Sequence, residues 1–173
     1  IINKLFARDL PSEIYKGMST AIPVILSKGE GKGIRPIMVG DGWMRLMETC
    51  VAQEVPTVSQ DFQPLQMAVC VPSGSEDIVH LIRQTLEALP QFVALKTDIS
   101  NAYGTVSRQA IFNAVNNKFQ KGQAELIKWF LNNHLRAPSY YLLETGERKF
   151  YSRGVAQGGP LSMFLFCLTL QPA

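Results

Sequence analysis

The chain of 173 residues is long enough to bury a hydrophobic core, and its length suits one domain or two half-domains. Hydrophobic residues make up 46% and charged residues 18% of the sequence, which is typical of a globular protein and excludes a low-complexity chain. The net charge of +3 is a mild basic excess that permits a nucleic-acid partner without indicating one. The longest apolar run, residues 161–170, is about half a membrane span, so no membrane partner is expected.

The cysteines and histidines give no sign of a metal site. Cys50, Cys70 and Cys167 form no C-x-x-C pair, which predicts free thiols in a reducing compartment. We therefore expect an intracellular protein of the nucleus or cytoplasm, with an organelle left open. His80 and His134 have no partner at metal-ligand spacing and are interpreted as structural. The chain has no signal-peptide pattern and ends directly after an apolar run, so we expect an excerpt from a longer polypeptide.

The N-terminal region predicts a glycine-rich hairpin. Residues 1–17 suggest a loop and a short helix, and the apolar stretch 20–26 around Pro23 predicts an edge strand. A tip with three glycines and two lysines follows, and then a second strand begins at Ile34. Locally, a solvated, flexible tip is the better interpretation, although glycines and lysines also suit a phosphate ligand.

Two helices and a short strand are expected next. Asp41 can cap a helix over 42–55, and residues 66–71 predict a short strand. Ser73 and Glu76 have the spacing of a capping box at the start of another helix. The residues expected to be buried on this second helix are Ile78, Val79, Ile82, Leu86 and Leu89.

The stretch around Asp98 is the centre of the functional interpretation. Apolar residues alternate with Ala94, Lys96 and Asp98, which predicts a strand over 93–99. Asp98 would then lie at the carboxyl end of a buried strand, where an ionised carboxylate requires a cation or hydrogen-bond donors. On this stretch alone, a carboxylate that caps the following turn is the favoured interpretation.

The C-terminal region completes a mixed pattern. Helices are expected over 107–119 and 123–135, a hairpin over 139–155, and a largely buried apolar segment over 161–170. Helices and strands do not alternate regularly, so an α+β fold is preferred over a doubly wound sheet.

Four stretches, taken together and in order, resemble reverse transcriptases of non-LTR retrotransposons. The first two are the glycine-rich hairpin (28–37, running on through 39–46) and the segment 66–76. The third is Lys96-Thr97-Asp98-Ile99-Ser100-Asn101-Ala102-Tyr103, which is similar to motif A of that family. The fourth is residues 154–162, which are similar to its motif B. The resemblance implies a right-hand polymerase fragment. Residues 1–90 would be mainly fingers, with the hairpin 28–39. Residues 91–173 would be a partial palm, with helices and a hairpin over 107–155 between the two motifs.

The resemblance also implies site residues for a reaction that depends on two metal ions. Asp98 would be the catalytic carboxylate and would bind Mg²⁺ or Mn²⁺, with Ile99 beside the metal. The residues implied to bind the incoming dNTP are Arg35, Lys28, Lys32, Ala102, Tyr103 and Gln157, with the Tyr103 ring excluding a 2′-hydroxyl. Gly158, Gly159 and Pro160 would contact the template and primer.

The sequence departs from the family pattern at two points, and both bear on whether the chain alone is active. Gly159 stands where the family usually has an aspartate, and motif C, an aromatic-x-Asp-Asp hairpin, does not occur before residue 173. We therefore expect the chain alone to be inactive, and metal binding to require residues beyond this sequence. Two interpretations stay open. The chain is a segment of an RNA-directed DNA polymerase that works with an RNA template and DNA primer, or it is a non-catalytic structural or RNA-binding subunit of a larger assembly.

Overall fold

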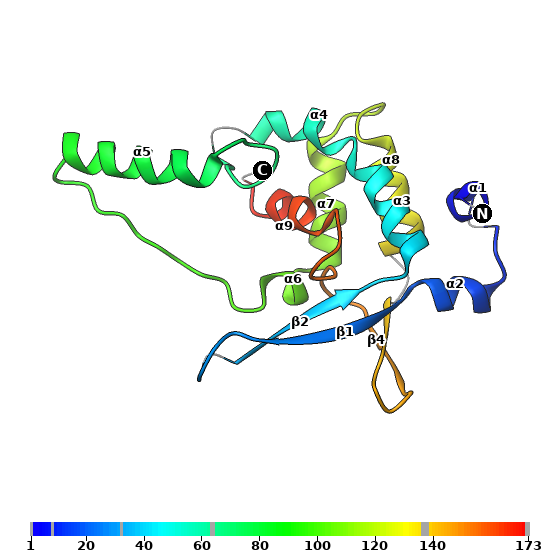
Figure 1. The fold of residues 1–173 in the computed structure, drawn as a ribbon. Helices are drawn as coiled ribbons and strands as arrows, with labels where there is room; N and C mark the ends of the chain where they lie inside the picture. Colours follow the sequence, from blue (N-terminus) through cyan, green and yellow to red (C-terminus); the bar gives the residue numbers. More distant parts are fainter. Residues whose placement is uncertain (1, 8, 32, 63–64, 136–138, 172–173) are drawn as a thin grey trace.

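The computed structural model describes residues 2–7, 9–31, 33–62, 65–135 and 139–171 (Figure 1). Its N-terminal half contains α1 (Ile2–Ala7), α2 (Ser12–Met18), β1 (Thr20–Ser27), β2 (Ile34–Val39), α3 (Gly42–Ala52), α4 (Val55–Ser59), the 3₁₀ turn η1 (Gln60–Phe62) and α5 (Gly74–Ala88). The second half contains α6 (Ala102–Thr105), α7 (Arg108–Lys118), α8 (Glu125–Phe130), the π-helical turn η2 (Leu131–Leu135), β3 (Ser139–Leu142), β4 (Arg148–Tyr151) and α9 (Ser162–Thr169). The fold is therefore mixed, and the predicted α+β class is compatible with it.

A four-stranded mixed sheet forms around the glycine-rich hairpin, in the order β2-β1-β3-β4. Strands β1 and β2 pair antiparallel from Ile22 with Val39 to Ser27 with Ile34, which confirms the predicted hairpin. Among the described residues, strand β3 pairs in parallel with β1 only at Thr20 and Ala21. The prediction of an edge strand is therefore correct for the part around Pro23 and wrong for the first two residues of β1.

The hydrophobic core lies among α3, α7, α8 and α9, and it draws residues from both halves of the chain. Its most deeply buried side chains include Met47, Val51, Ile111, Val115, Ile127, Leu131, Leu161, Leu165 and Leu168. The helices predicted around these residues are confirmed. The Asp41 side chain accepts a 2.9 Å hydrogen bond from the Trp43 N–H and caps α3, and the Ser107 hydroxyl accepts from the Ala110 N–H at α7.

The predicted strand over 93–99 is wrong. These residues lie in an extended connection between α5 and α6 without strand pairing, and Val93 and Leu95 are 90% and 88% exposed (Figure 1). An alternating sequence becomes a strand only where a neighbouring strand satisfies its backbone groups. None of the four strands in the described part of the sheet runs beside this connection.

Three further expectations for the region between α4 and α6 are also wrong. Residues 66–71 form turns rather than a strand, because the Gln66 side chain accepts hydrogen bonds from the Ala68 and Val69 N–H groups. Helix α5 forms as predicted but projects away from the core, so its apolar stripe is exposed (Figure 1). Ser73 has a left-handed backbone, and its side chain makes no capping hydrogen bond. In the described residues, no helix combines the length and the apolarity needed to cross a membrane.

Candidate functional site

A cavity of about 440 Å³ lies where the glycine-rich hairpin, α6 and the segment after β4 meet. We call it the larger cavity. Its walls come from stretches that are far apart in the sequence: Pro36 and Met38 on β2, Asn101 and Gly104 at the ends of α6, Tyr141 on β3, and residues 151–153 and 155–157. The cavity is thus bordered by the hairpin, by the stretch that contains Asn101 and Gly104, and by residues 151–157.

The segment 103–106 and the segment 154–155 are joined by backbone hydrogen bonds. The Val155 N–H donates to the Tyr103 carbonyl at 2.8 Å, and the Gly154 N–H donates to the Val106 carbonyl at 2.8 Å. Gly154 has a φ of +73°, and a Cβ atom there would lie 2.5 Å from the Tyr103 carbonyl oxygen. Glycine is therefore required at position 154 both by its conformation and by the close approach of α6.

The 156–160 turn lies against the hairpin. The Met38 N–H donates a 3.0 Å hydrogen bond to the Gln157 carbonyl. Gly158 has a φ of +109°, and a Cβ atom there would lie 3.3 Å from Cγ2 of Ile37. This contact holds the turn against β2 and places Gln157 in the cavity wall.

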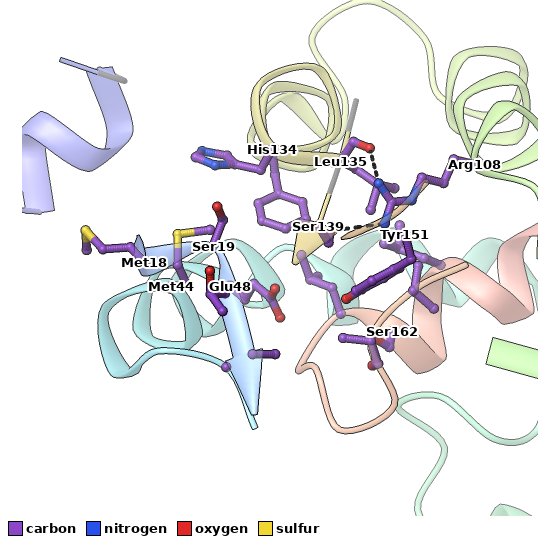
Figure 2. A pocket seen from close by; sticks show the side chains of 18 of the residues that line it. Met18, Ser19, Met44, Glu48, Arg108, His134, Leu135, Ser139, Tyr151 and Ser162 are labelled. Atoms are coloured by element: carbon purple, nitrogen blue, oxygen red, sulfur yellow. Dashed lines mark hydrogen bonds between the residues drawn. The ribbon is translucent and has the colours of Figure 1, made fainter. Parts of the chain in front are cut away.

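Arg108 links the segments that support the larger cavity. Its guanidinium donates to the Gly154 carbonyl at 2.9 Å. It also donates to the Leu135 carbonyl at 3.0 Å and to the Ser139 hydroxyl at 3.0 Å (Figure 2). It also lies over the Tyr151 ring, and burial lowers its pKa. The sequence analysis missed this residue. The available signal was a cation in the first turn of α7, where the helix dipole disfavours positive charge.

The predicted site residues are only partly brought together. Gln157 lines the larger cavity, and Gly158 and Gly159 follow it in the same turn. Tyr103 and Ala102 are half-buried in α6, and the Tyr103 ring packs on Phe166, 5.5 Å between centroids, without lining the cavity. Burial raises the Tyr103 pKa, and Cys167 adds to this effect.

The remaining predicted residues that the structure describes lie on the surface. Asp98 and Ile99 are exposed on the connection before α6, and Arg35 and Lys28 are exposed on the hairpin. Pro160 is exposed at the end of the turn, and Lys32 falls outside the described residues. Arg153, which the sequence analysis did not single out, is exposed and lines the larger cavity. It is a cation placed where an anionic ligand could be bound.

The donor set does not fit a pair of divalent cations. The described residues contain no group of three or more histidine, cysteine or acidic side chains that could hold a metal ion. Asp98 offers one carboxylate on an exposed segment, whereas two bridged cations require several. No metal-dependent step is derived from these residues.

Glu48 is a second residue that the sequence analysis missed. It lies on α3 among the residues that bury that helix, four positions after Met44 and three before Val51. Burial raises the pKa of its carboxyl group to about 7, against a smaller opposing effect of the Arg45 charge. A carboxylate within an apolar helical stripe is the sequence signal that could have identified it.

Comparison with known proteins gives no assignment, since no protein-family model and no curated protein matches the chain. What the chain does must therefore be inferred from its residues and their arrangement.

Proposed function

We propose that this chain is the fingers and first palm portion of an RNA-directed DNA polymerase, and that the larger cavity receives the incoming nucleotide. The supporting observation is that three of the four stretches that resemble the family meet at one cavity. Pro36 and Met38 follow the glycine-rich tip, Asn101 belongs to motif A and Gln157 belongs to motif B, and all four residues line one cavity. This convergence on one cavity is what supports the proposal.

The residues of this cavity suit a nucleotide beside a base pair. Gly158, with its positive φ, allows a strand to pass close to the backbone, and Gln157 offers an amide to a base or sugar. Arg153 supplies a planar cation of the kind that binds phosphate in a bidentate manner. A hybrid of RNA and DNA would be held mainly through backbone shape and 2′-hydroxyls.

In this proposal Asp98 is one ligand of the catalytic Mg²⁺ or Mn²⁺ in a site that other carboxylates complete. Its exposed segment would have to lie against those residues. Tyr103 acts in this proposal as the support of the 154–155 segment through its backbone carbonyl. A role for its ring as a steric gate would require the ring to leave Phe166.

A second candidate function is a non-catalytic, RNA-binding subunit of a larger assembly. The observation that favours it is the exposed apolar surface of α5 and the connection after it, where Leu81 is 59% and Leu95 is 88% exposed. Apolar surface of this extent is typical of a segment that is covered by another chain.

Titration of the chain with a Mg²⁺-dNTP and with a short RNA–DNA hybrid separates these two functions. We expect dNTP binding, and about tenfold weaker binding for Arg153→Ala, because one charge-assisted phosphate contact is lost. Arg148→Ala, an exposed arginine on β4 outside the cavity, is the matched control and should bind as the unaltered chain does. Hybrid binding without any dNTP binding would favour the RNA-binding subunit, and binding of neither would contradict both functions.

A further inference from the structure

One face of the four-stranded sheet forms the floor of the larger cavity. Tyr141 on β3 pairs with Ala21 on β1, and Met38 on β2 pairs with Pro23 on β1. Side chains two positions apart on a strand project from the same face, so Tyr141 and Met38 lie on one face of the sheet. Pro36 lies on this face as well, two positions before Met38. All three side chains line the larger cavity.

Two tyrosine rings lie side by side on this floor. Ser139 on β3 pairs with Tyr151 on β4, so Tyr151 projects from the same face as Tyr141. The two ring centroids are 6.2 Å apart, and the ring planes meet at 41°. The Arg108 guanidinium carbon lies 5.4 Å from the centroid of the Tyr151 ring (Figure 2). Both tyrosines are only half-buried and line the cavity, so aromatic surface is open to a ligand.

A cation and two amide side chains surround the rings. Arg153 is exposed and lines the cavity two positions after Tyr151. Asn101 and Gln157 also line it, and an amide side chain can both donate and accept hydrogen bonds. No acidic side chain is found among the described residues that line the cavity. The wall therefore combines aromatic faces and a positive charge with hydrogen-bonding groups that can adapt to different partners.

We propose that Tyr141 and Tyr151 form a stacking wall for the base of a nucleoside phosphate whose phosphate groups reach Arg153. The inference deepens the proposed function, since it names how the larger cavity would hold the base. The cavity volume of about 440 Å³ falls within the roughly 300–1,000 Å³ that is usual for small-molecule sites. An aromatic ring stacks on the face of any base, and the amides of Asn101 and Gln157 can meet different base edges. The cavity therefore accepts all four bases.

Nuclear magnetic resonance of the unaltered chain tests the stacking wall without any substitution. The probes are adenosine monophosphate, Mg²⁺-dATP and inorganic tripolyphosphate, which has no base. We expect both nucleotides to move the ring-proton signals of Tyr141 upfield, because a stacked base places these protons in its ring current. Tripolyphosphate should cause no such shift. The proposal is overturned if neither nucleotide moves the signals upfield, or if tripolyphosphate moves them equally.

Substitution of Tyr141 separates stacking from the phosphate contact. Tyr141→Leu should bind Mg²⁺-dATP about tenfold more weakly, because the stacked ring is lost, whereas Tyr141→Phe should bind within about twofold of the unaltered chain. The matched control is Tyr140→Leu, which should bind as the unaltered chain does. Tyr140 projects from the opposite face of β3, where Nζ of Lys16 lies 5.3 Å from its ring centroid. Tripolyphosphate should bind Tyr141→Leu as it binds the unaltered chain, and Arg153→Ala more weakly.

The same titrations separate the stacking wall from the proposed function. If Tyr141→Leu binds Mg²⁺-dATP as tightly as the unaltered chain, the stacking wall is refuted and the proposed function stands. If adenosine monophosphate binds as tightly as Mg²⁺-dATP and its binding depends on Tyr141, the stacking wall stands. The role of the cavity as the site of an incoming triphosphate then fails.

The choice of base gives an independent test. We expect the four Mg²⁺-dNTPs to bind within about tenfold of one another, because stacking does not depend on the base edge. One base bound about a hundredfold more tightly than the other three would show that the cavity recognises an edge, and it would contradict the proposal.

Discussion

Val155 and Tyr103 are joined by a 2.8 Å hydrogen bond from the Val155 N–H to the Tyr103 carbonyl, across 52 positions of sequence. This bond joins α6 to the segment after β4, and both segments contribute residues to the wall of the larger cavity. Gly154 precedes Val155, and its α-carbon faces the same carbonyl. The cavity therefore depends on a contact between backbones rather than between side chains.

Gly154→Ala should lower the free energy of unfolding by more than about 3 kcal/mol, because the new methyl group would collide with backbone atoms that cannot move independently. The control is Gly146→Ala in the β3–β4 turn. Gly146 has a similar φ of +82° but no atom within 4 Å of a Cβ, so only the conformational cost of about 1–2 kcal/mol is expected. Urea unfolding of the two variants measures the difference, and equal losses would contradict the close approach at Gly154.

The two helix caps anticipated at Asp41 and Ser73 provide a second test. The Asp41 carboxylate caps α3, so Asp41→Ala should cost about 1 kcal/mol in the free energy of unfolding. The Ser73 side chain makes no capping bond at α5, and Ser73→Ala should change this free energy by less than about 0.5 kcal/mol. Thermal unfolding of both variants measures these effects. If Ser73→Ala lowered the free energy of unfolding as much as Asp41→Ala, the Ser73 side chain would cap α5 as the sequence predicts.

The local elements could largely be predicted because their signals lie within a few residues. The Asp41 cap, the apolar runs on either side of the glycine-rich tip and the apolar segment at 161–170 each indicate their own local structure. The error over 93–99 arose because strand formation depends on a neighbour that local sequence does not specify. Likewise, the stripe of α5 showed which residues would be buried if another element covered it, but not whether one does.

For the candidate site, the resemblance singled out Gln157, which lines one cavity with Met38 and Asn101, and its predicted role in nucleotide binding stays a prediction. It could not find Arg108, Arg153 or Glu48, because their roles depend on contacts with distant segments. Arg108 binds the Leu135 carbonyl, 27 positions away, and Glu48 lies beside Gly159. Contacts between segments this far apart produce no recognisable residue spacing in the sequence.

Arg108→Lys should lower the free energy of unfolding by about 2–4 kcal/mol, because an ammonium group cannot satisfy three acceptors that are arranged for a planar guanidinium. Arg148→Lys, at an exposed position on β4, is the matched control and should stay within about 0.5 kcal/mol. Unfolding in guanidinium chloride measures the free energy of unfolding of the two variants. Full stability of Arg108→Lys would mean that the three hydrogen bonds do not hold β3 and Gly154 together.

Glu48 should make the free energy of unfolding depend on pH in a direction opposite to that of most carboxylates. Its pKa is about 7 in the folded chain and 4.5 ordinarily, so the folded state binds the proton more tightly. The stabilisation is therefore complete below pH 4.5, falls as the pH rises towards 7, and amounts to at most about 3 kcal/mol. Glu48→Gln should lose this dependence and become more stable than the unaltered chain at pH 8, whereas Glu87→Gln should keep it. Urea unfolding at pH 5, 6, 7 and 8 measures the three profiles. Parallel profiles for Glu48→Gln and the unaltered chain would show that the carboxyl group titrates in the folded protein as it does in water.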